Sequence, residues 1–143
     1  IRSLLVLLLV GLACGTRVNF NNRCGYRVQV IPTENGRASV QQALLNPGQG
    51  AAADFGGNGM NFKNGYGGRT LAEFSFNSFS GLDFYDLSVI VGYDTPMQIS
   101  SNNGGRAVTC RGAGCPDAYL YPTDDTKTRS TRTGFTFTIT FCP

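Results

Sequence analysis

The clearest pattern in the chain is the strict alternation of residues 134–141, which read GFTFTITF. The four apolar residues would line one face of a strand, and the three threonines would line the other. The same two-residue period returns in 71–79, and no segment shows the period of a helix. Short alternating runs recur about every ten residues, separated by turns rich in glycine. We therefore predict an all-β fold, a single-domain β-sandwich stapled by disulfides.

The remaining strands follow from the same alternation and from turn dipeptides. The full set of expected strands is 16–21, 26–31, 38–45, 51–55, 71–79, 82–91, 97–100 and 134–141. Pro32 is expected to end the second of them. The glycine-rich segment 56–68 has two interpretations. It is either a flexible lip that presents Phe62 and Tyr66 to a ligand, or a pair of tight turns whose aromatic side chains pack locally.

The N-terminus reads as a targeting segment. Residues 4–13 form an apolar stretch well short of the roughly 20 residues that cross a bilayer, so we expect no stable membrane insertion. A basic residue precedes this stretch and small residues follow it, as in signal peptides. We predict a signal peptide over 1–15 and one secreted, extracellular domain over 16–143. A lipid anchor on Cys14 is the alternative.

Removing Cys14 with the signal peptide leaves an even number of cysteines. Four cysteines allow three pairings. We favour Cys24–Cys142, because both residues end candidate terminal strands, and Cys110–Cys115, because these two are only five residues apart. On a loop-entropy estimate, closing the longer loop would restrict the unfolded chain by about 4–5 kcal/mol.

The composition excludes several classes of chemistry. The chain has no histidine, which removes imidazole metal sites, Ser-His-Asp triads and Cys-His nucleophile pairs. Oxidised cysteines would not supply a thiolate, so catalysis would need carboxylates, hydroxyls or Lys and Arg. A net charge of +3 without a basic run does not favour nucleic acid. We expect a monomer with no metal and no cofactor.

An acidic block lies on the best strand-forming frame. Four of the nine acidic residues fall in 70–97, and no Lys or Arg lies between Arg69 and Arg106. Alternation places Glu73 on the face opposite Phe74. Carboxylates gathered on a sheet in this way indicate the floor of a cleft.

Six segments resemble, in the right order, motifs of the thaumatin-like family, which includes the pathogenesis-related and osmotin-like proteins. They are 22–24 (NRC), 70–75 (TLAEFS), 83–88 (DFYDLS), 92–97 (GYDTPM), 115–119 (CPDAY) with 124–125 (DD), and 141–143 (FCP). The resemblance implies a small form of the thaumatin-like β-sandwich, without the disulfide-rich second domain of larger members. It also implies a bond between the NRC and FCP cysteines, Cys24 and Cys142.

The family's cleft is lined by one Arg, one Glu and three Asp and is thought to hold β-1,3-glucan. By motif, Glu73 and Asp86 match two of its acids, and Asp124 matches the late Asp. Val91 stands where the remaining Asp should fall.

Other residues of the chain offer substitutes for the missing cleft positions. Arg69 or Lys63 would replace the cleft Arg, and Asp94 or Asp83 would partly replace the missing acid. With Phe62 and Tyr66, these residues complete the expected binding surface.

The resemblance leaves three classes of function open. The favoured one is a secreted protein that binds β-1,3-glucan or a related fungal cell-wall polysaccharide, with a defence or antifungal role, because Val91 replaces an acid. The second is a weak endo-β-1,3-glucanase with Glu73 as the acid and Asp86 as the base or nucleophile. The third is a hydrolase inhibitor or membrane-perturbing protein that acts independently of the cleft.

Overall fold

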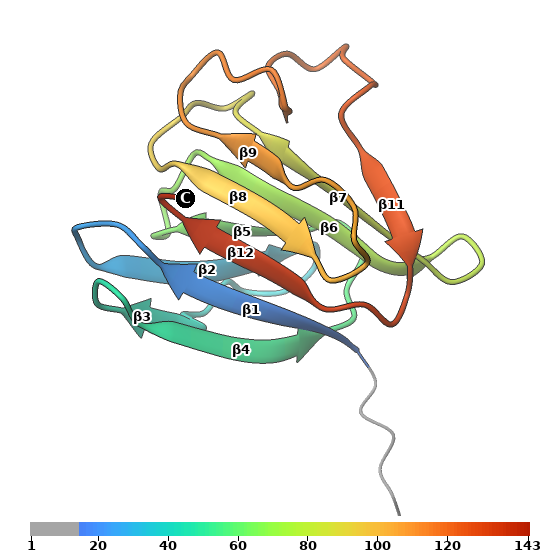
Figure 1. The fold of residues 1–143 in the computed structure, drawn as a ribbon, viewed down its shortest axis with the longest axis horizontal. Helices are drawn as coiled ribbons and strands as arrows, with labels where there is room; N and C mark the ends of the chain where they lie inside the picture. The colour runs from blue at the N-terminus through green and yellow to red at the C-terminus, as the bar shows by residue number, and fades with distance from the viewer. Residues whose placement is uncertain (1–14) are drawn as a thin grey trace, which may run out of the picture.

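The computed structural model describes residues 15–143 as two stacked β-sheets (Figure 1). The strands are β1 (Thr16–Asn22), β2 (Val28–Glu34), β3 (Ala43–Leu45), β4 (Gly50–Phe55), β5 (Met60–Asn64), β6 (Leu71–Ser78), β7 (Leu82–Ser88), β8 (Met97–Ser101), β9 (Val108–Cys110), β10 (Ala118–Tyr119), β11 (Arg129–Arg132) and β12 (Phe137–Phe141). This part of the chain contains no helix of the length and apolarity that crossing a bilayer requires. The predicted all-β sandwich is confirmed. Cys14 and the rest of 1–14 lie outside the described residues.

The two sheets differ in size and connectivity. The smaller sheet has five strands in the order β4-β1-β12-β8-β9, and the larger has seven, in the order β10-β7-β6-β5-β2-β3 with β11 also beside β7. In the smaller sheet the first and last strands, β1 and β12, pair in parallel at the centre. The Cys24–Cys142 disulfide joins the chain just beyond these two strands, and the Cys110–Cys115 bond closes a short loop after β9. Both predicted disulfides are confirmed.

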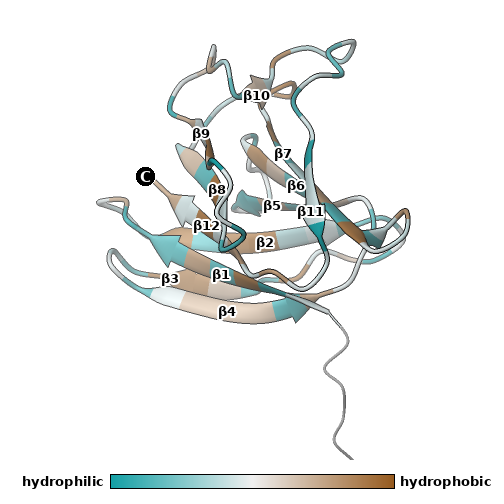
Figure 2. Ribbon diagram, turned by 45° about the vertical axis from the view of Figure 1, so that its right-hand side comes forward, coloured by the Kyte–Doolittle hydropathy of each residue, from teal (hydrophilic) through white to brown (hydrophobic). Residues whose placement is uncertain are grey.

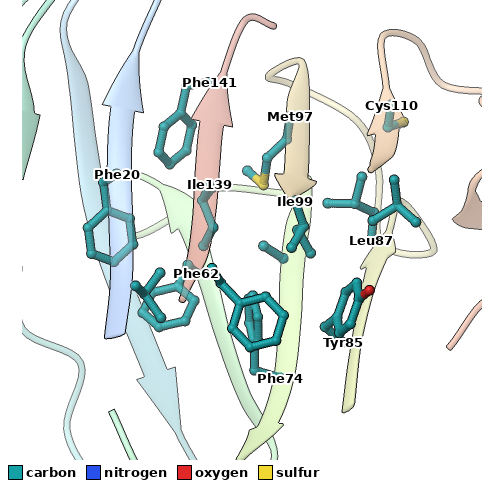
Figure 3. Packing of buried hydrophobic residues seen from close by; sticks show 14 of the residues in the cluster. Phe20, Phe62, Phe74, Tyr85, Leu87, Met97, Ile99, Cys110, Ile139 and Phe141 are labelled. Atoms are coloured by element: carbon teal, nitrogen blue, oxygen red, sulfur yellow. The ribbon is translucent and has the colours of Figure 1, made fainter. Parts of the chain in front are cut away.

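Aromatic side chains fill the space between the sheets (Figure 3). Phe74 on β6 lies at the centre of this cluster, with ring centroids 5.6 Å from Phe62, 5.1 Å from Phe76 and 5.2 Å from Phe137. Edge-to-face and offset arrangements of this kind add about 0.5–1.5 kcal/mol per pair beyond the burial of area. The alternation in 134–141 and 71–79 is therefore the pattern of two strands that face one core.

The structure corrects two expected strand boundaries, the end of β2 and the start of β3. Pro32 does not end this strand, which continues to Glu34 with Pro32 opposite Phe62 of β5. Beyond Val30, β2 has β5 as its only partner, so a residue without an N–H is tolerated on the open side. The expected strand 38–45 forms only in its last three residues, as β3.

Four strands were not predicted. β5 forms inside the glycine-rich segment 56–68, where its flanking turns obscure the strand pattern. The other three, β9, β10 and β11, are two to four residues long, too short to show a period. They form because β8 offers β9 a free edge, while β7 pairs with both β10 and β11.

We expect the two disulfides to differ in their effect on stability. Replacing Cys24 and Cys142 by alanine opens a loop with a sequence separation of 118 and should lower the free energy of unfolding by about 4–5 kcal/mol. Opening the Cys110–Cys115 loop should lower it by only about 2 kcal/mol. Guanidinium unfolding of the two double variants would measure the difference. Equal losses would contradict the loop-entropy account.

Candidate acidic pocket

The candidate site is built on one cross-strand pair of carboxylic acids. β6 and β7 are antiparallel, and their register places Glu73 directly opposite Asp86. The neighbouring residues Phe74 and Tyr85 are only 2% and 5% exposed, because they point into the core. Since side chains alternate along a strand, Glu73 and Asp86 point to the outer face of the larger sheet.

The acid pair belongs to a row of polar side chains across the larger sheet. The strand registers align Thr33 of β2 with Asn61 of β5, Asn61 with Glu73, and Glu73 with Asp86. Beyond β7, the Thr128 hydroxyl donates to Asp86 Oδ2 at 3.4 Å. The row thus presents oxygen atoms from four strands and from the loop before β11.

A pocket of about 310 Å³ opens over this row. It is lined by Gly59, Met60, Asn61, Glu73, Phe74, Ser75, Phe84, Asp86 and Thr128. One end of the pocket is apolar. It is formed by Phe84, which lies two residues before Asp86 and on the same face of β7. Its ring meets Phe79 edge to face, with centroids 6.0 Å apart.

The hairpin between β6 and β7 has a strained backbone, and it places Phe79 in the left-handed conformation. Asn77, Phe79 and Ser80 have φ values of 49°, 40° and 65°, and Gly81 follows at 81°. Left-handed backbone is unusual for a bulky residue and costs of order 1–3 kcal/mol at such a position. The Phe79 side chain is 84% exposed, so core packing does not account for its place. An exposed aromatic therefore stands beside the pocket.

The environment of Asp86 favours its protonated form. Its pKa is raised from 3.8 to about 9, first because burial strips water from the carboxylate, and then because Glu73 hydrogen-bonds it and repels a second negative charge. The hydrogen bond from Thr128 acts in the opposite direction. Asp86 Oδ1 is buried and has no hydrogen-bond partner among the described residues.

At neutral pH the Asp86 carboxyl therefore keeps its proton beside the carboxyl group of Glu73. Such a pair offers both a donor and an acceptor, which suits a neutral ligand rich in hydroxyl groups. In glycosidases the two carboxyls stand about 5–5.5 or 6.5–9.5 Å apart and flank the scissile bond. Here the two acids are directly opposed neighbours on adjacent strands. Asp86 has the raised pKa expected of a proton donor.

Asp83 does not join the pocket, although it was expected to. It is fully buried, and it accepts hydrogen bonds from the Thr16 hydroxyl at 3.0 Å, the Asn77 N–H at 2.8 Å and the Thr133 hydroxyl at 2.8 Å. The reason is parity: Asp83 and Asp86 are three residues apart on one strand and so face opposite sides. Asp83 is a structural acid that ties three segments together.

The two aromatic residues predicted for binding also lie elsewhere. Phe62 is fully buried between Phe20, Phe55 and Phe74, so it cannot form an exposed lip. The segment 56–68 holds strand β5 between turns, as the local-packing interpretation expected. Tyr66 is exposed in the loop after β5 but does not line the pocket.

Asp94 and Arg69 belong to a turn away from the pocket. The Asp94 carboxylate accepts the backbone N–H groups of Arg69 at 2.8 Å and Thr70 at 3.2 Å. In return, the Thr70 hydroxyl accepts the N–H of Asp94 at 3.1 Å. Neither Asp94 nor Arg69 lines the pocket, and neither does Lys63.

Asp124 lies in the loop between β10 and β11 and is not among the lining residues. Its pKa is lowered, chiefly because the Thr126 hydroxyl donates to its carboxylate at 2.8 Å, and Lys127 adds an ion pair at 3.4 Å. Val91, at the position of the missing family Asp, is exposed in the turn after β7.

Sequence reasoning missed Asn61, Phe84 and Thr128 as pocket residues. Phe84 was detectable, because it shares a face of β7 with Asp86 by simple alternation. Asn61 and Thr128 carried no such signal, because their segments did not read as strands next to β6 and β7.

Comparisons with known proteins agree with this fold. No family model matches the chain. The chain is 34% identical over 168 aligned residues to thaumatin-like pathogenesis-related protein 3 of Avena sativa, covering 99% of this chain and 97% of the relative.

Two solved structures share the fold at lower identity. The protein elicitor MoHrip2 from Magnaporthe oryzae superposes with a TM-score of 0.71 at 21% identity, over 90% of this chain and 99% of its own. The thaumatin-like xylanase inhibitor TLXI superposes with a TM-score of 0.69 at 20% identity, over 88% of this chain and 99% of its own.

Asp86 should make the protein less stable as pH rises. The unfolded chain loses this proton near pH 3.8, while the folded protein keeps it to about pH 9. The contribution of Asp86 to stability is therefore full below pH 3.8 and declines as the pH rises through 9. Asp86→Asn removes the decline and should raise the free energy of unfolding at pH 7 by about 1–3 kcal/mol, the usual penalty for an incompletely bonded buried group.

Urea unfolding of Asp86→Asn at pH 4 and pH 8 would measure this, with the exposed Asp125→Asn as the matched control. A variant no more stable than wild type at either pH would contradict the raised pKa of Asp86.

Asp83→Ala should destabilise the fold. It leaves the Asn77 N–H and the hydroxyls of Thr16 and Thr133 without their acceptor, a loss of about 3 kcal/mol or more, because bonds to a charged group are worth about 1.5–3 kcal/mol each. Thermal unfolding would show the loss. An Asp83→Ala protein of normal stability would contradict the structural role.

Proposed function

The chain belongs to the thaumatin-like family of pathogenesis-related proteins, and on this premise we propose that its acidic pocket binds β-1,3-glucan. Pathogenesis-related relatives imply a defence-type role. In this proposal the protein is secreted and recognises the polysaccharide of fungal cell walls through Glu73 and Asp86. Two disulfides fit the oxidising conditions of the extracellular space.

The observation that carries the proposal is the cross-strand pair of Glu73 and Asp86 in the pocket, with the Asp86 carboxyl kept protonated by its raised pKa. The hydroxyl groups of a glucan both donate and accept hydrogen bonds, and the pair provides one partner of each kind without a metal or a cofactor. Asn61 and Thr128 extend the polar surface on either side.

The aromatic end of the pocket supports the same class of ligand. The Phe84 ring lines the pocket, and Phe79 is held exposed beside it. Sugar rings have apolar C–H faces that pack on such rings. Polar groups that fix orientation beside an apolar wall are the usual make-up of a small-ligand site.

The geometry favours binding over hydrolysis. Glu73 and Asp86 are directly opposed on adjacent strands of one sheet face, so they do not flank a bound glycosidic bond from two sides. A retaining or inverting enzyme keeps its two carboxyls about 5–5.5 or 6.5–9.5 Å apart for that purpose. No acid from the turn around Val91 completes a second pair, because that turn does not line the pocket.

Pull-down on insoluble β-1,3-glucan tests the proposal. Glu73→Gln removes the charged acceptor and should weaken binding about tenfold, the equivalent of about 1.4 kcal/mol. Asp86→Asn keeps a donor and should weaken it less. Asp125→Asn, an exposed acid outside the pocket, should bind as the wild type does.

The same proteins should release no reducing ends from laminarin. Release by wild type above the Glu73→Gln background would establish the glucanase instead. Binding or antifungal activity indifferent to both acids would favour the hydrolase-inhibitor or membrane-perturbing alternative.

A further inference from the structure

A second groove lies between β4 and the segment 32–40. Two contiguous hollows of about 190 and 290 Å³ make up this β4 groove. Both are lined by Glu34, Arg37, Phe55 and Met60. Met60 also lines the acidic pocket, but neither hollow contains Glu73 or Asp86, so the groove does not include the acid pair of the proposed glucan site.

One wall of the groove, formed by Asp54 and Phe55, is the end of an unpaired sheet edge. β4 is the outermost strand of the smaller sheet and pairs only with β1 (Figure 1). β3 is the outermost strand of the larger sheet on the same side, and a short turn joins it to β4. The sandwich is thus open here, with two strand edges facing one gap.

The register shows which backbone groups of β4 are free. Asn22 bonds toward the β4 side with both its N–H and its C=O, at 2.9 Å to the Gln49 C=O and 2.8 Å from the Gly48 N–H. Because these directions alternate along a strand, Phe20 and Val18 also bond toward β4. Their partners in the register are Ala51 and Ala53.

The N–H and C=O of Ala52 and Asp54 therefore point away from β1, into the open edge. No described residue bonds to them.

The edge lacks the usual protection against pairing. β4 reads GAAADF, so its side chains are small along most of its length, and Figure 2 shows it as weakly hydrophobic. It contains no lysine, proline or bulge, the devices that normally block such edges. Asp54 is its only charge, and Arg17 pairs with it at 3.6 Å.

The smaller hollow supplies a site for an apolar side chain. Phe55 of β4 lines it on one side, and Pro32, Val40 and Met60 line it from other segments. Val40 is 63% exposed. The rim is charge-balanced, because Glu34 pairs with Arg37 at 3.5 Å just as Asp54 pairs with Arg17. A neutral rim over an apolar floor does not select a charged ligand.

We propose that the β4 groove takes an extended, uncharged segment of a partner polypeptide, which adds to β4 as a further strand. Free backbone groups at 52 and 54 would bond its main chain, and the hollow around Phe55 would hold one apolar side chain. This division of labour, main chain for affinity and a pocket for specificity, is that of strand-addition complexes. A polysaccharide would not match the alternating donors and acceptors of a strand edge.

A labelled peptide tests this directly. The probe is a fluorescein-labelled heptapeptide of alternating threonine and leucine, with a short polyethylene-glycol tail, titrated into the full chain by fluorescence polarisation. Ala52→Pro removes the outward N–H but no bond to β1, so the fold should keep its melting temperature while binding weakens at least tenfold. Ala52→Ser keeps the N–H and should bind as wild type does.

A second measurement does not depend on the proline variant. In hydrogen exchange, the probe should slow the amides of Ala52 and Asp54 and leave Ala53, already bonded to β1, unchanged. Val40→Asp, at an exposed position, should also weaken binding. Glu73→Gln should not, which separates this site from the glucan proposal.

Three results would overturn the proposal. They are the absence of saturable binding, equal binding by Ala52→Pro, and a concentration-dependent dimer in sedimentation that Ala52→Pro abolishes. The last would assign the edge to a second copy of the chain.

Discussion

The register between β6 and β7 is the constraint on which both the core and the pocket depend. In this register Phe74 and Tyr85 face inward while Glu73 and Asp86 face outward as partners. A slip of one residue would exchange the two faces of the strand, burying carboxylates and exposing aromatic rings. The observed register has the lower free energy because it buries the aromatic rings. The packing of the core therefore fixes the alignment of Glu73 with Asp86.

The acid pair is held at some expense to the fold. Buried oxygens of Asp86 and Asn61 lack donors among the described residues, and the Asp86 carboxyl stays protonated because burial disfavours its charge. Strain in the hairpin that carries Phe79 adds a further penalty at the same end of the sheet. Departures from optimal local structure cluster where a protein binds its ligand, and here all three surround one pocket.

Alternation along the strands predicted the fold class and the two faces of β6, and the positions of the cysteines predicted both disulfides. The motif pattern predicted Glu73 and Asp86, which are paired across β6 and β7. Asp83 as a substitute acid and Phe62 as part of an exposed lip were wrong, because their faces depend on the parity of β7 and on the presence of β5. Thr128 could not be found, because its contact with Asp86 spans 42 residues and depends on how β11 joins the sheet. Long-range pairing of short strands leaves no local period to detect.

The central position of β12 has a consequence for how the chain acquires its shape. This strand lies between β1 and β8, yet it comes after every other strand in the chain. Until 137–141 have left the ribosome, β1 and β8 cannot be joined, and the smaller sheet remains in two separate pieces. Assembly of the smaller sheet is therefore dominated by contacts between distant parts of the chain, which makes it slow.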